Sequence, residues 1–369
     1  DRGDLERAVR LALAEARLAP ISETLDGADA AGASTPNPEG KSDFAAPLCD
    51  PEIVRLSADS ARGLLERGLG DEESGRLAWS VGSLAYAATH TPVRSAEVTG
   101  IQLEIHVGRG PTSGRAAAVG RTLAALGPRT LLDAARTMHR GEGAEPYQAN
   151  GAPFVLAPLA FARLLGLLNR QALSSWGYQG GIEGSWLHGR LGENIASERL
   201  TLCDDGTDLR GLPLPFDLRG RTKRPIELIA RGVILTPAID DALAKELGRE
   251  PTPHAIGPDE SRATHLVVSP GEAGPSDLLA AAEGGYWISD LAPLEGFEPR
   301  ALRFRGVAHG VRRITNGKLG IAIENFSWDG DLPNVLANLE IVGSELLAVA
   351  DAEPFLGATL APAVVVART

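Results

Sequence analysis

The spacing of apolar residues predicts that the first part of the chain combines amphipathic helices with an alternating strand. Leucine and valine recur at helical spacing over residues 5–18, and this stripe predicts a helix that needs a partner surface. Residues 98–107 (VTGIQLEIHV) alternate between apolar and polar positions, as a half-buried strand does. We therefore predict an α/β domain over residues 1–145. Further helices are predicted at residues 58–67, 72–88, 116–126 and 130–139, and a flexible loop rich in Gly, Ala, Ser and Pro at about 26–47.

Beyond residue 150 the pattern changes to short β segments separated by Gly, Pro and Asp. A strand at 154–156 leads into a helix at 158–173, which Pro158 starts in its first turn. Strands without regular helix alternation predict an antiparallel, β-rich domain over residues 150–369, so the expected fold class is α+β. The predicted strands lie at 200–203, 226–230 and 233–235, and the predicted helices at 240–247, 276–283 with Ser276 as N-cap, and 332–339.

The composition describes a protein with an ordinary apolar core and an acidic surface. The 369 residues suffice for two domains, and 43% of them are hydrophobic. The formal net charge is −12, from 48 acidic and 36 basic residues. This charge argues against direct binding of nucleic acid, because phosphate binding needs a concentrated basic surface. Residues 219–224 (RGRTKR) form the one dense basic run, and we interpret them as a solvated loop.

No stretch of the sequence approaches the roughly 18 consecutive apolar residues of a membrane span. The start of the sequence also lacks the basic-then-apolar pattern of a secretion signal. We therefore expect a cytoplasmic protein that does not act at a membrane. The first residue is Asp rather than Met, which leaves open whether a segment precedes the sequence.

Several short motifs have structural interpretations that we prefer to chemical ones. Cys49 and Cys203 form neither a disulfide framework nor a metal-binding pair, and Cys203 is interpreted as a small strand residue rather than a reactive thiol. The glycines of residues 108–114 follow a strand, but their spacing departs from a dinucleotide loop, so a hairpin or loop is favoured. The Asp-rich segments at 204–208 and 329–331 lack calcium-loop spacing and are predicted to be turns.

An ordered series of motifs in the second half of the chain resembles a known family. It begins with S-x-x-x-G-x-x-G-E at residues 185–193, the Asp204-Asp205 turn, F-D-x-x-G at residues 216–220 and Arg231-Gly232-Val233. It continues with VSPG at 268–271, I-x-N-G-K at 314–318, I-x-N-F at 323–326 and a closing strand at 363–367. Together these resemble the C-terminal half of the TldD/PmbA (TldE) family, two-subunit microbial metallopeptidases also described as modulators of DNA gyrase.

The resemblance does not extend to the metal-binding residues of the TldD-type subunit. In that subunit a helical H-E-x-x-x-H motif and a distant C-terminal Cys are expected to hold zinc, with the Glu as general base. Matching the family's preceding strand to residues 153–158 places Gly166 and Gln171 at the two His positions and Leu167 at the Glu position. The Cys position falls near residues 350–353 (ADAE), and no His lies between His139 and His188. We therefore expect neither a catalytic residue nor a metal ligand in this chain.

The resemblance implies a PmbA/TldE-like subunit without metal, inactive alone, that pairs with a zinc-holding TldD-like homologue or with a second copy. Such a subunit would help to form a cavity for small peptides or peptide-derived natural products. Alternatives are an amide-bond hydrolase or transferase subunit in a natural-product biosynthetic pathway, and a non-catalytic binding or scaffold protein. The candidate polar groups of the cavity are His188, Asp217, Arg219 and His254, although ordinary turn or loop polarity is the favoured interpretation of these four residues.

Overall fold

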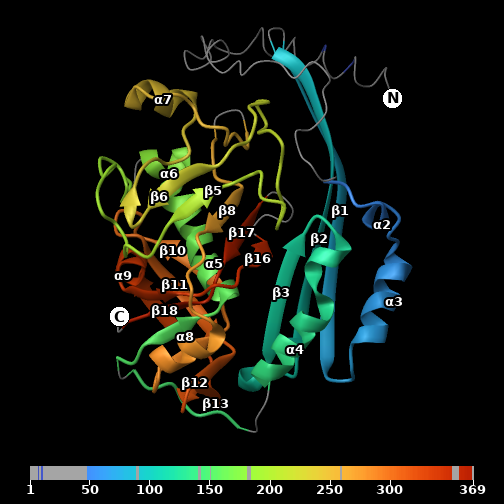
Figure 1. Ribbon diagram of the computed structural model, residues 1–369, viewed down its shortest axis with the longest axis vertical. Coiled ribbons are helices and arrows are strands. Elements are labelled where there is room, and N and C mark those ends of the chain that lie inside the picture. Colours follow the sequence, from blue (N-terminus) through green and yellow to red (C-terminus); the bar gives the residue numbers. More distant parts are fainter. Residues whose placement is uncertain are drawn as a thin grey trace.

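The computed structural model describes residues 48–88, 91–139, 143–149, 151–180, 184–257, 260–350 and 357–367, together with Arg7 and Arg10 (Figure 1). The predicted loop at 26–47 lies outside the described residues, as does the predicted helix at 5–18 apart from Arg7 and Arg10, which are helical. Within the described ranges, no helix has the length and apolar character needed to cross a membrane.

The N-terminal part is a three-stranded antiparallel sheet covered on one face by helices (Figure 1). The covered face presents alternate residues of β2, from Ile101 to Val107, to apolar side chains of the helices. The opposite face of β3 packs against the C-terminal part, where Ala117 joins the main core. The elements are α2 (Pro51–Val54), α3 (Ala58–Gly68), β1 (Glu73–Ala88), β2 (Thr91–Val107), η1 (Gly110–Thr112), β3 (Gly114–Gly120), η2 (Leu123–Leu126) and α4 (Pro128–His139).

Two of the predicted helices in this part are wrong. Residues 72–88 form β1, which pairs with β2 from Glu73↔Val107 to Ala88↔Thr91. Residues 116–126 form most of β3 and the short η2 turn. Both segments are rich in Ala, which favours helix locally, but pairing with β2 overrides that preference. The strand at 98–107 and the helices at 58–67 and 130–139 are confirmed, and residues 108–113 connect β2 to β3 as expected for a hairpin.

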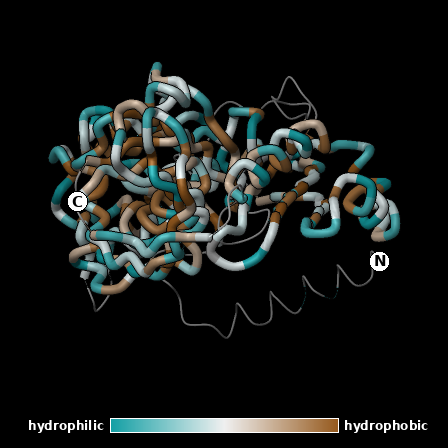
Figure 2. The backbone as a smooth tube through the Cα atoms, turned by 90° about the horizontal axis from the view of Figure 1, so that it is seen from below, coloured by the Kyte–Doolittle hydropathy of each residue, from teal (hydrophilic) through white to brown (hydrophobic). Residues whose placement is uncertain are grey.

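The C-terminal part contains two six-stranded sheets and one three-stranded sheet around a central helix. Their orders are β13-β12-β9-β4-β18-β15, β16-β17-β8-β5-β6-β7 and β10-β11-β14. Most strand pairs are antiparallel, whereas β4 with β9 and β8 with β17 are parallel. In Figure 2, hydrophobic segments run through the interior of this part and hydrophilic loops surround them. This arrangement confirms the α+β fold class.

The C-terminal helices and strands for which the sequence predicted residue ranges lie within a few residues of those ranges. Helix α8 is capped at Gly274, so the predicted N-cap Ser276 is wrong, and residues 329–331 end a strand rather than forming a turn. The strands are β4 (Phe154–Leu156), β5 (Leu202–Asp204), β6 (Ile226–Ala230), β7 (Val233–Ile234), β8 (His265–Val268), β9 (Tyr286–Ile288), β10 (Asp290–Phe297), β11 (Arg303–His309), β12 (Val311–Thr315), β13 (Lys318–Ile323), β14 (Phe326–Asp331), β15 (Leu339–Val342), β16 (Leu347–Ala350), β17 (Ala358–Ala361) and β18 (Val364–Val366). The helices are α5 (Pro158–Leu168), η3 (Asn169–Leu173), α6 (Ser175–Gln179), α7 (Asp241–Leu247), α8 (Pro275–Ala281) and α9 (Leu332–Ala337).

Helix α5 is the centre of the C-terminal core. Of its eleven residues, all except Pro158 and Arg163 are buried. A helix that is apolar on nearly every side must be surrounded by other elements, and α5 contacts β4, β10, β16 and β17. It continues without a break into η3, one turn of π-helix over residues 169–173.

Polar contacts of buried groups join the N-terminal sheet to the C-terminal part. Arg121, just after β3, is buried, and its guanidinium donates hydrogen bonds to the backbone oxygens of Thr99, Leu212 and Pro213. Burial lowers the pKa of Arg121 to about 10, so the side chain stays charged at neutral pH. Because three carbonyl groups on two parts of the chain share one guanidinium, this contact fixes the end of β3 against the loop before β6.

Candidate functional site

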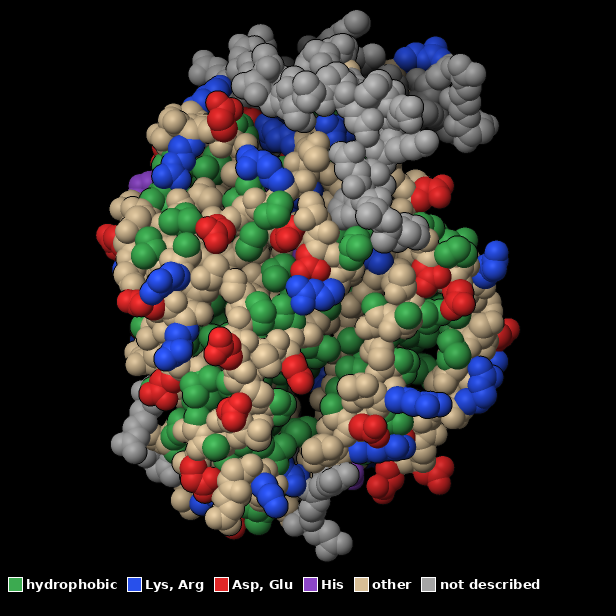
Figure 3. Space-filling view, in the orientation of Figure 1, with side chains coloured by type: hydrophobic (Ala, Val, Ile, Leu, Met, Phe, Trp, Pro, Cys, Tyr) green, Lys and Arg blue, Asp and Glu red, His purple; other side chains and the backbone are tan. Residues whose placement is uncertain are grey.

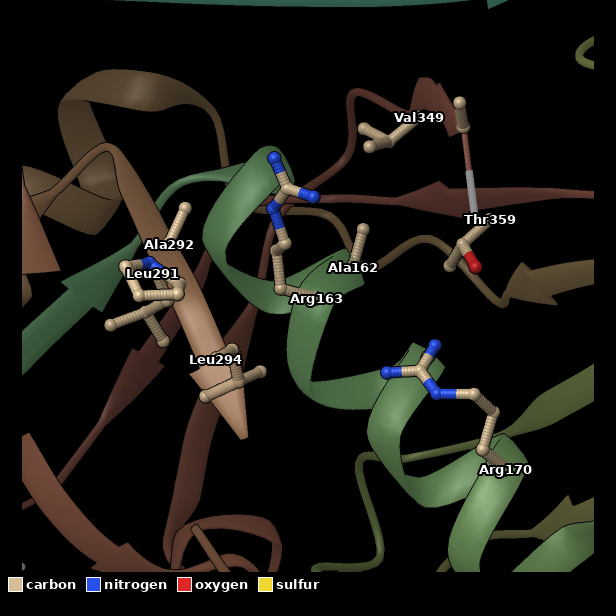
Figure 4. Close-up of a pocket in the computed structure, with 11 residues that line it drawn as sticks. Ala162, Arg163, Arg170, Leu291, Ala292, Leu294, Val349 and Thr359 are labelled. Carbon is tan, nitrogen blue, oxygen red and sulfur yellow. The ribbon is translucent and has the colours of Figure 1, made fainter. Parts of the chain in front are cut away.

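The candidate site is a small pocket beside α5, near the N-terminal sheet. Its cavity volume is about 130 Å³. Two arginines, Arg163 and Arg170, extend from the same side of the α5–η3 helix toward it, and the Thr359 side chain stands opposite (Figure 4). Among the described residues, both charged side chains of the lining are therefore cationic. The remaining lining residues are Ala162, Gly166, Leu291, Ala292, Pro293, Leu294, Val349 and Ala350.

This pocket brings together one position that the family resemblance assigns to a metal ligand and the start of the segment expected to contain another. Gly166, at the first His position, and Ala350, at the start of the Cys segment, both line it. Leu167, at the Glu position, is buried in the main core. Gln171, at the second His position, lies close to Gly296 of β10, and its Oε1 is buried with no hydrogen-bond partner among the residues that the structure describes.

The donor set at this pocket does not fit zinc. Glycine, alanine and two guanidinium groups offer neither an imidazole nor a thiolate, and the positive charges oppose a divalent cation. Throughout the described residues, no three His, Cys, Asp or Glu side chains gather closely enough to hold a metal ion.

A buried carboxylate positions the first of the two arginines. The side chain of Asp290, at the start of β10, is fully buried. Its Oδ1 accepts a hydrogen bond from Nε of Arg163 at 3.1 Å, and its Oδ2 accepts one from Nη1 of Arg115 on β3 at 2.7 Å. Arg115 also lies 3.6 Å from Glu104. The carboxylate thus ties the central helix to the N-terminal sheet and orients Arg163 at the pocket.

A second polar cluster lies in the core of the sheet that contains β5. The Oδ2 of Asp204 lies 3.0 Å from Nζ of Lys223 and 3.0 Å from Nε2 of His254, and all three side chains are buried. The Oδ1 of Asp204 accepts hydrogen bonds from the backbone N–H groups of Thr264 and His265. Nδ1 of His254 lies 2.6 Å from the hydroxyl oxygen of Thr252. Every oxygen of this carboxylate is therefore occupied by protein groups.

The surroundings of this cluster lower the pKa of Asp204, His254 and His265. Burial alone would raise the pKa of Asp204, but Lys223, His254 and the N–H of His265 lower it well below its usual range. Burial lowers the pKa of His254, and the nearby Asp204 only partly opposes this effect. Burial also lowers the pKa of His265. The cluster is therefore an ionised Asp204 beside a neutral His254.

Three of the four predicted site residues belong to one neighbourhood. The Oδ1 of Asp217 accepts hydrogen bonds from the backbone N–H groups of Arg219 and Arg221, and its Oδ2 accepts one from Ala255, next to His254. The Arg219 side chain forms an ion pair with Asp241. These contacts hold the F-D-x-x-G turn in place, and the left-handed backbone of Gly220 (φ +72°) completes it.

The fourth predicted residue, His188, is exposed, and its ring lies 5.5 Å from that of Tyr178. None of the four predicted residues lines the pocket beside α5. The interpretation of Cys203 as a strand residue agrees with its place in β5, where burial raises the pKa of its thiol to about 12.

Arg163 and Arg170 were not among the predicted site residues, although one feature of the sequence indicates Arg163. Arg163 is the sole charged residue within an otherwise apolar helix, and such a charge requires a partner. Arg170 follows seven residues later, which places it on the same side of the helix. Asp290 lies 127 residues from Arg163 in sequence, so no local pattern could reveal their pairing.

Comparisons with known sequences agree with the motifs of the second half of the chain. The family model described as the PmbA/TldA metallopeptidase C-terminal domain matches residues 149–369. A curated protein named a metalloprotease, from Methanothermobacter thermautotrophicus, is 27% identical over 165 residues. These residues make up 44% of this chain and 36% of that protein, so the chain spans little more than a third of the length of this curated relative.

Solved structures with the same fold cover most of the chain. TldE from Thermococcus kodakarensis matches with a TM-score of 0.76 at 20% identity, covering 100% of this chain and 84% of that one. A candidate modulator of DNA gyrase from Bacteroides thetaiotaomicron VPI-5482 matches with a TM-score of 0.74 at 20% identity, with the same coverage of 100% and 84%. A further candidate modulator of a DNA gyrase, from Thermotoga maritima MSB8, matches with a TM-score of 0.74 at 19% identity, covering 87% of this chain and 76% of that one. At these identities the likeness shows the fold. Because the family model covers more than half of its residues, the chain belongs to the PmbA/TldD family of metallopeptidase-like proteins.

Proposed function

We propose that this chain is the metal-free subunit of a TldD/TldE-type peptidase pair. A homologous subunit with H-E-x-x-x-H would hold the zinc, and this chain would complete a cavity for small peptides or peptide-derived natural products. The observation that carries the proposal is the pocket beside α5, where Gly166 stands at a ligand position, Ala350 begins the segment expected to hold the Cys, and the charged lining residues of the described chain are Arg163 and Arg170. A chain that keeps the family fold but lacks the H-E-x-x-x-H residues can still serve a peptidase by binding its substrate.

The contribution of such a subunit would be positional rather than chemical. Zinc in the partner would supply the activation of water. The residues of this chain would hold one end of the peptide, exclude water from one wall of the cavity and keep the scissile bond in register with the partner's site. The ion pair of Arg163 with the buried Asp290 suits this role. A cation that is already held in position loses little conformational entropy when it binds an anion.

The uncharged outer part of an edge strand supports pairing with a second chain. The sequence from Leu77 to Val93 contains no Asp, Glu, Lys or Arg, and β1 lies at the edge of its sheet. The β1–β2 hairpin extends beyond the C-terminal part, and Val81 and Val93 on it are 53% and 67% exposed (Figure 1). Edge strands usually carry charges that prevent pairing with other chains, so this edge is suited to an interface.

The predicted closing strand near the C-terminus is less suited to that role. The predicted strand at 363–367 contains β18, which lies inside a sheet between β4 and β15 and is fully buried.

Acidic and basic side chains are interspersed over much of the face shown in Figure 3, as on an ordinary solvated surface. The edge of β1 is therefore our candidate surface for the homologous subunit.

Co-expression with a homologue from the same genome that retains H-E-x-x-x-H tests the proposal. We expect the two chains to elute as a 1:1 complex in size-exclusion chromatography, with about one zinc per pair by elemental analysis. The isolated chain should hold no stoichiometric metal. Elution of this chain as a monomer beside the homologue, or about one zinc per isolated chain, would exclude the proposed role. Elution as a homodimer that ignores the homologue would favour the symmetric alternative.

A further inference from the structure

We propose that the pocket beside α5 binds a carboxylate group, and that its ligand is the C-terminal carboxylate of a short peptide. This inference rests on the proposed function for the identity of the ligand as a peptide, but not for the binding of the carboxylate itself. The site is formed by the guanidinium groups of Arg163 and Arg170 together with the side chain of Thr359.

The first argument is the state of Arg163. Its Nε is hydrogen-bonded to Asp290, which fixes the plane of the guanidinium. Within the described part of the chain, its two terminal NH₂ groups have no hydrogen-bond partner, and the side chain is 29% exposed. A guanidinium held at Nε and open at its other two nitrogens is arranged for a bidentate bond to a carboxylate.

The second argument is the sign of the charge. Arg163 and Arg170 are the charged residues of the lining, and no carboxylate lines the pocket among the described residues. Asp290 is already shared between Arg163 and Arg115, so it neutralises Arg163 only in part. Arg170, which makes an interaction of its own, is the other cation among the described lining residues. An anion entering the pocket is therefore attracted chiefly by Arg163, whose charge Asp290 only partly neutralises.

The third argument is size and polarity. A cavity of about 130 Å³ is close to the roughly 150 Å³ that accommodates a benzene-sized molecule. The pocket therefore takes a terminal residue with a small side chain and not a long stretch of peptide. Apolar side chains of Leu291, Pro293, Leu294 and Val349 line the remaining surface, and such surface suits the aliphatic part of that residue.

The test is a binding measurement that needs no peptidase activity. The probe is an N-terminally fluorescein-labelled Gly-Ala-Ala peptide, used with a free C-terminal carboxylate and as the C-terminal amide, and binding is followed by fluorescence anisotropy. The protein is the full chain, alone and in complex with the zinc-holding homologue. We expect the free acid to bind at least about tenfold more tightly than the amide, as charge-assisted bidentate contacts generally provide.

Three variants separate this site from the rest of the surface. Arg163→Lys keeps the charge and the contact with Asp290 but removes the guanidinium fork, and Arg170→Gln removes the second charge. Both should bring the ratio of acid to amide affinity close to one. Arg305→Gln is the matched control, because Arg305 is an exposed arginine on β11 whose guanidinium pairs with Asp329. It should leave the ratio unchanged.

The outcomes distinguish this inference from the proposed function. Equal binding of acid and amide by the unmodified chain, or a ratio that survives in both pocket variants, would overturn the carboxylate site while leaving the peptidase pair intact. Acid-selective binding that inorganic phosphate inhibits with an affinity equal to that of the free-acid peptide would identify a general anion site and overturn the peptide assignment. Acid-selective binding by a chain that forms no peptidase pair would support the site and reject the proposed function.

Discussion

Nη1 of Arg115 on β3 lies 2.7 Å from Oδ2 of Asp290 on β10, which connects the N-terminal sheet to the wall of the candidate pocket. The other oxygen of the same carboxylate holds Arg163 of α5. The N-terminal sheet therefore takes part in positioning the pocket cation, although none of its residues lines the pocket. A substitution of Asp290 therefore tests how much this contact between the two parts of the chain contributes to stability.

Replacement of Asp290 by Asn should loosen both contacts at once. The variant leaves Arg115 and Arg163 without the carboxylate that they share, and we expect a loss of about 2 kcal/mol in the free energy of unfolding, because both guanidiniums are partly exposed. Urea denaturation measures it. The double variant Asp290→Asn, Arg163→Gln should lose less than the sum of the single losses. Additive losses would show that the two residues do not interact.

The buried Asp204 should matter far more for stability than an exposed aspartate with a similar partner. Asp204→Asn leaves the Lys223 ammonium buried without a counter-charge, and we expect a loss of about 3–5 kcal/mol or failure to fold. Asp329→Asn is the control, since Asp329 pairs with Arg305 at the surface and should change little. Similar urea midpoints for the two variants would contradict our assignment of Asp204 as a structural charge.

The free energy of unfolding should decrease as the pH falls below about 6.5, the ordinary pKa of histidine. Burial lowers the pKa of His254 and His265 in the folded state, so the unfolded chain binds protons more readily below about pH 6.5. Each histidine then contributes a slope of up to about 1.4 kcal/mol per pH unit, and Asp204, whose folded pKa is also lowered, adds to the loss below about pH 4. The measurement is the urea midpoint between pH 8 and pH 4.

The charged groups around His254 do not reverse the lowering of its pKa by burial. Asp204 and Asp217 raise the pKa of His254 and Lys223 lowers it, but burial is the largest influence. In His254→Gln the slope between pH 7 and pH 5 should become shallower even if the variant is less stable overall. A midpoint that rises on acidification, or an unchanged slope in this variant, would contradict the assignment of a neutral, buried His254.

The β1–β2 hairpin should depend on a glycine in the C-terminal part. A Cβ atom at Gly220 would lie 2.3 Å from the Tyr86 ring, and the backbone there is left-handed (φ +72°). Gly317 has a similar conformation (φ +63°) with no atom within 4 Å of its Cβ position. Gly220→Ala should therefore cost about 1–3 kcal/mol more than Gly317→Ala. Equal costs in thermal denaturation would show that the hairpin does not rest on this turn.

The sequence predicted the C-terminal part better than the N-terminal part for a physical reason. Turns such as Arg231-Gly232 require left-handed backbone, which only a few residues adopt easily, and they mark strand ends reliably. Residues 73–88 contain a period of two in Leu77, Trp79 and Val81, but the surrounding Ala and Ser residues also fit a helix. The pairing with β2 decides between them, and a local pattern does not contain it.

The candidate site, too, could be predicted from the sequence only where its features are local. The departure of Gly166, Leu167 and Gln171 from the H-E-x-x-x-H motif is visible in the sequence because motif and spacing are local. The environment of Arg163 depends on Asp290 and Arg115, which lie far from it in sequence and meet it only in the fold. The predicted role of Asp217 in the cavity stays a prediction, while its three backbone hydrogen bonds already account for its place in the turn.

The most direct test of the proposed function is the rate of peptide hydrolysis by the zinc-holding homologue with and without this chain. Equal amounts of homologue are assayed on a mixture of short peptides, with product formation followed by mass spectrometry. We predict that the homologue alone is at least about tenfold slower than the 1:1 pair, and that this chain alone yields no product. Full activity of the homologue alone, or hydrolysis by this chain alone, would contradict the assignment of this chain as the subunit that completes the cavity.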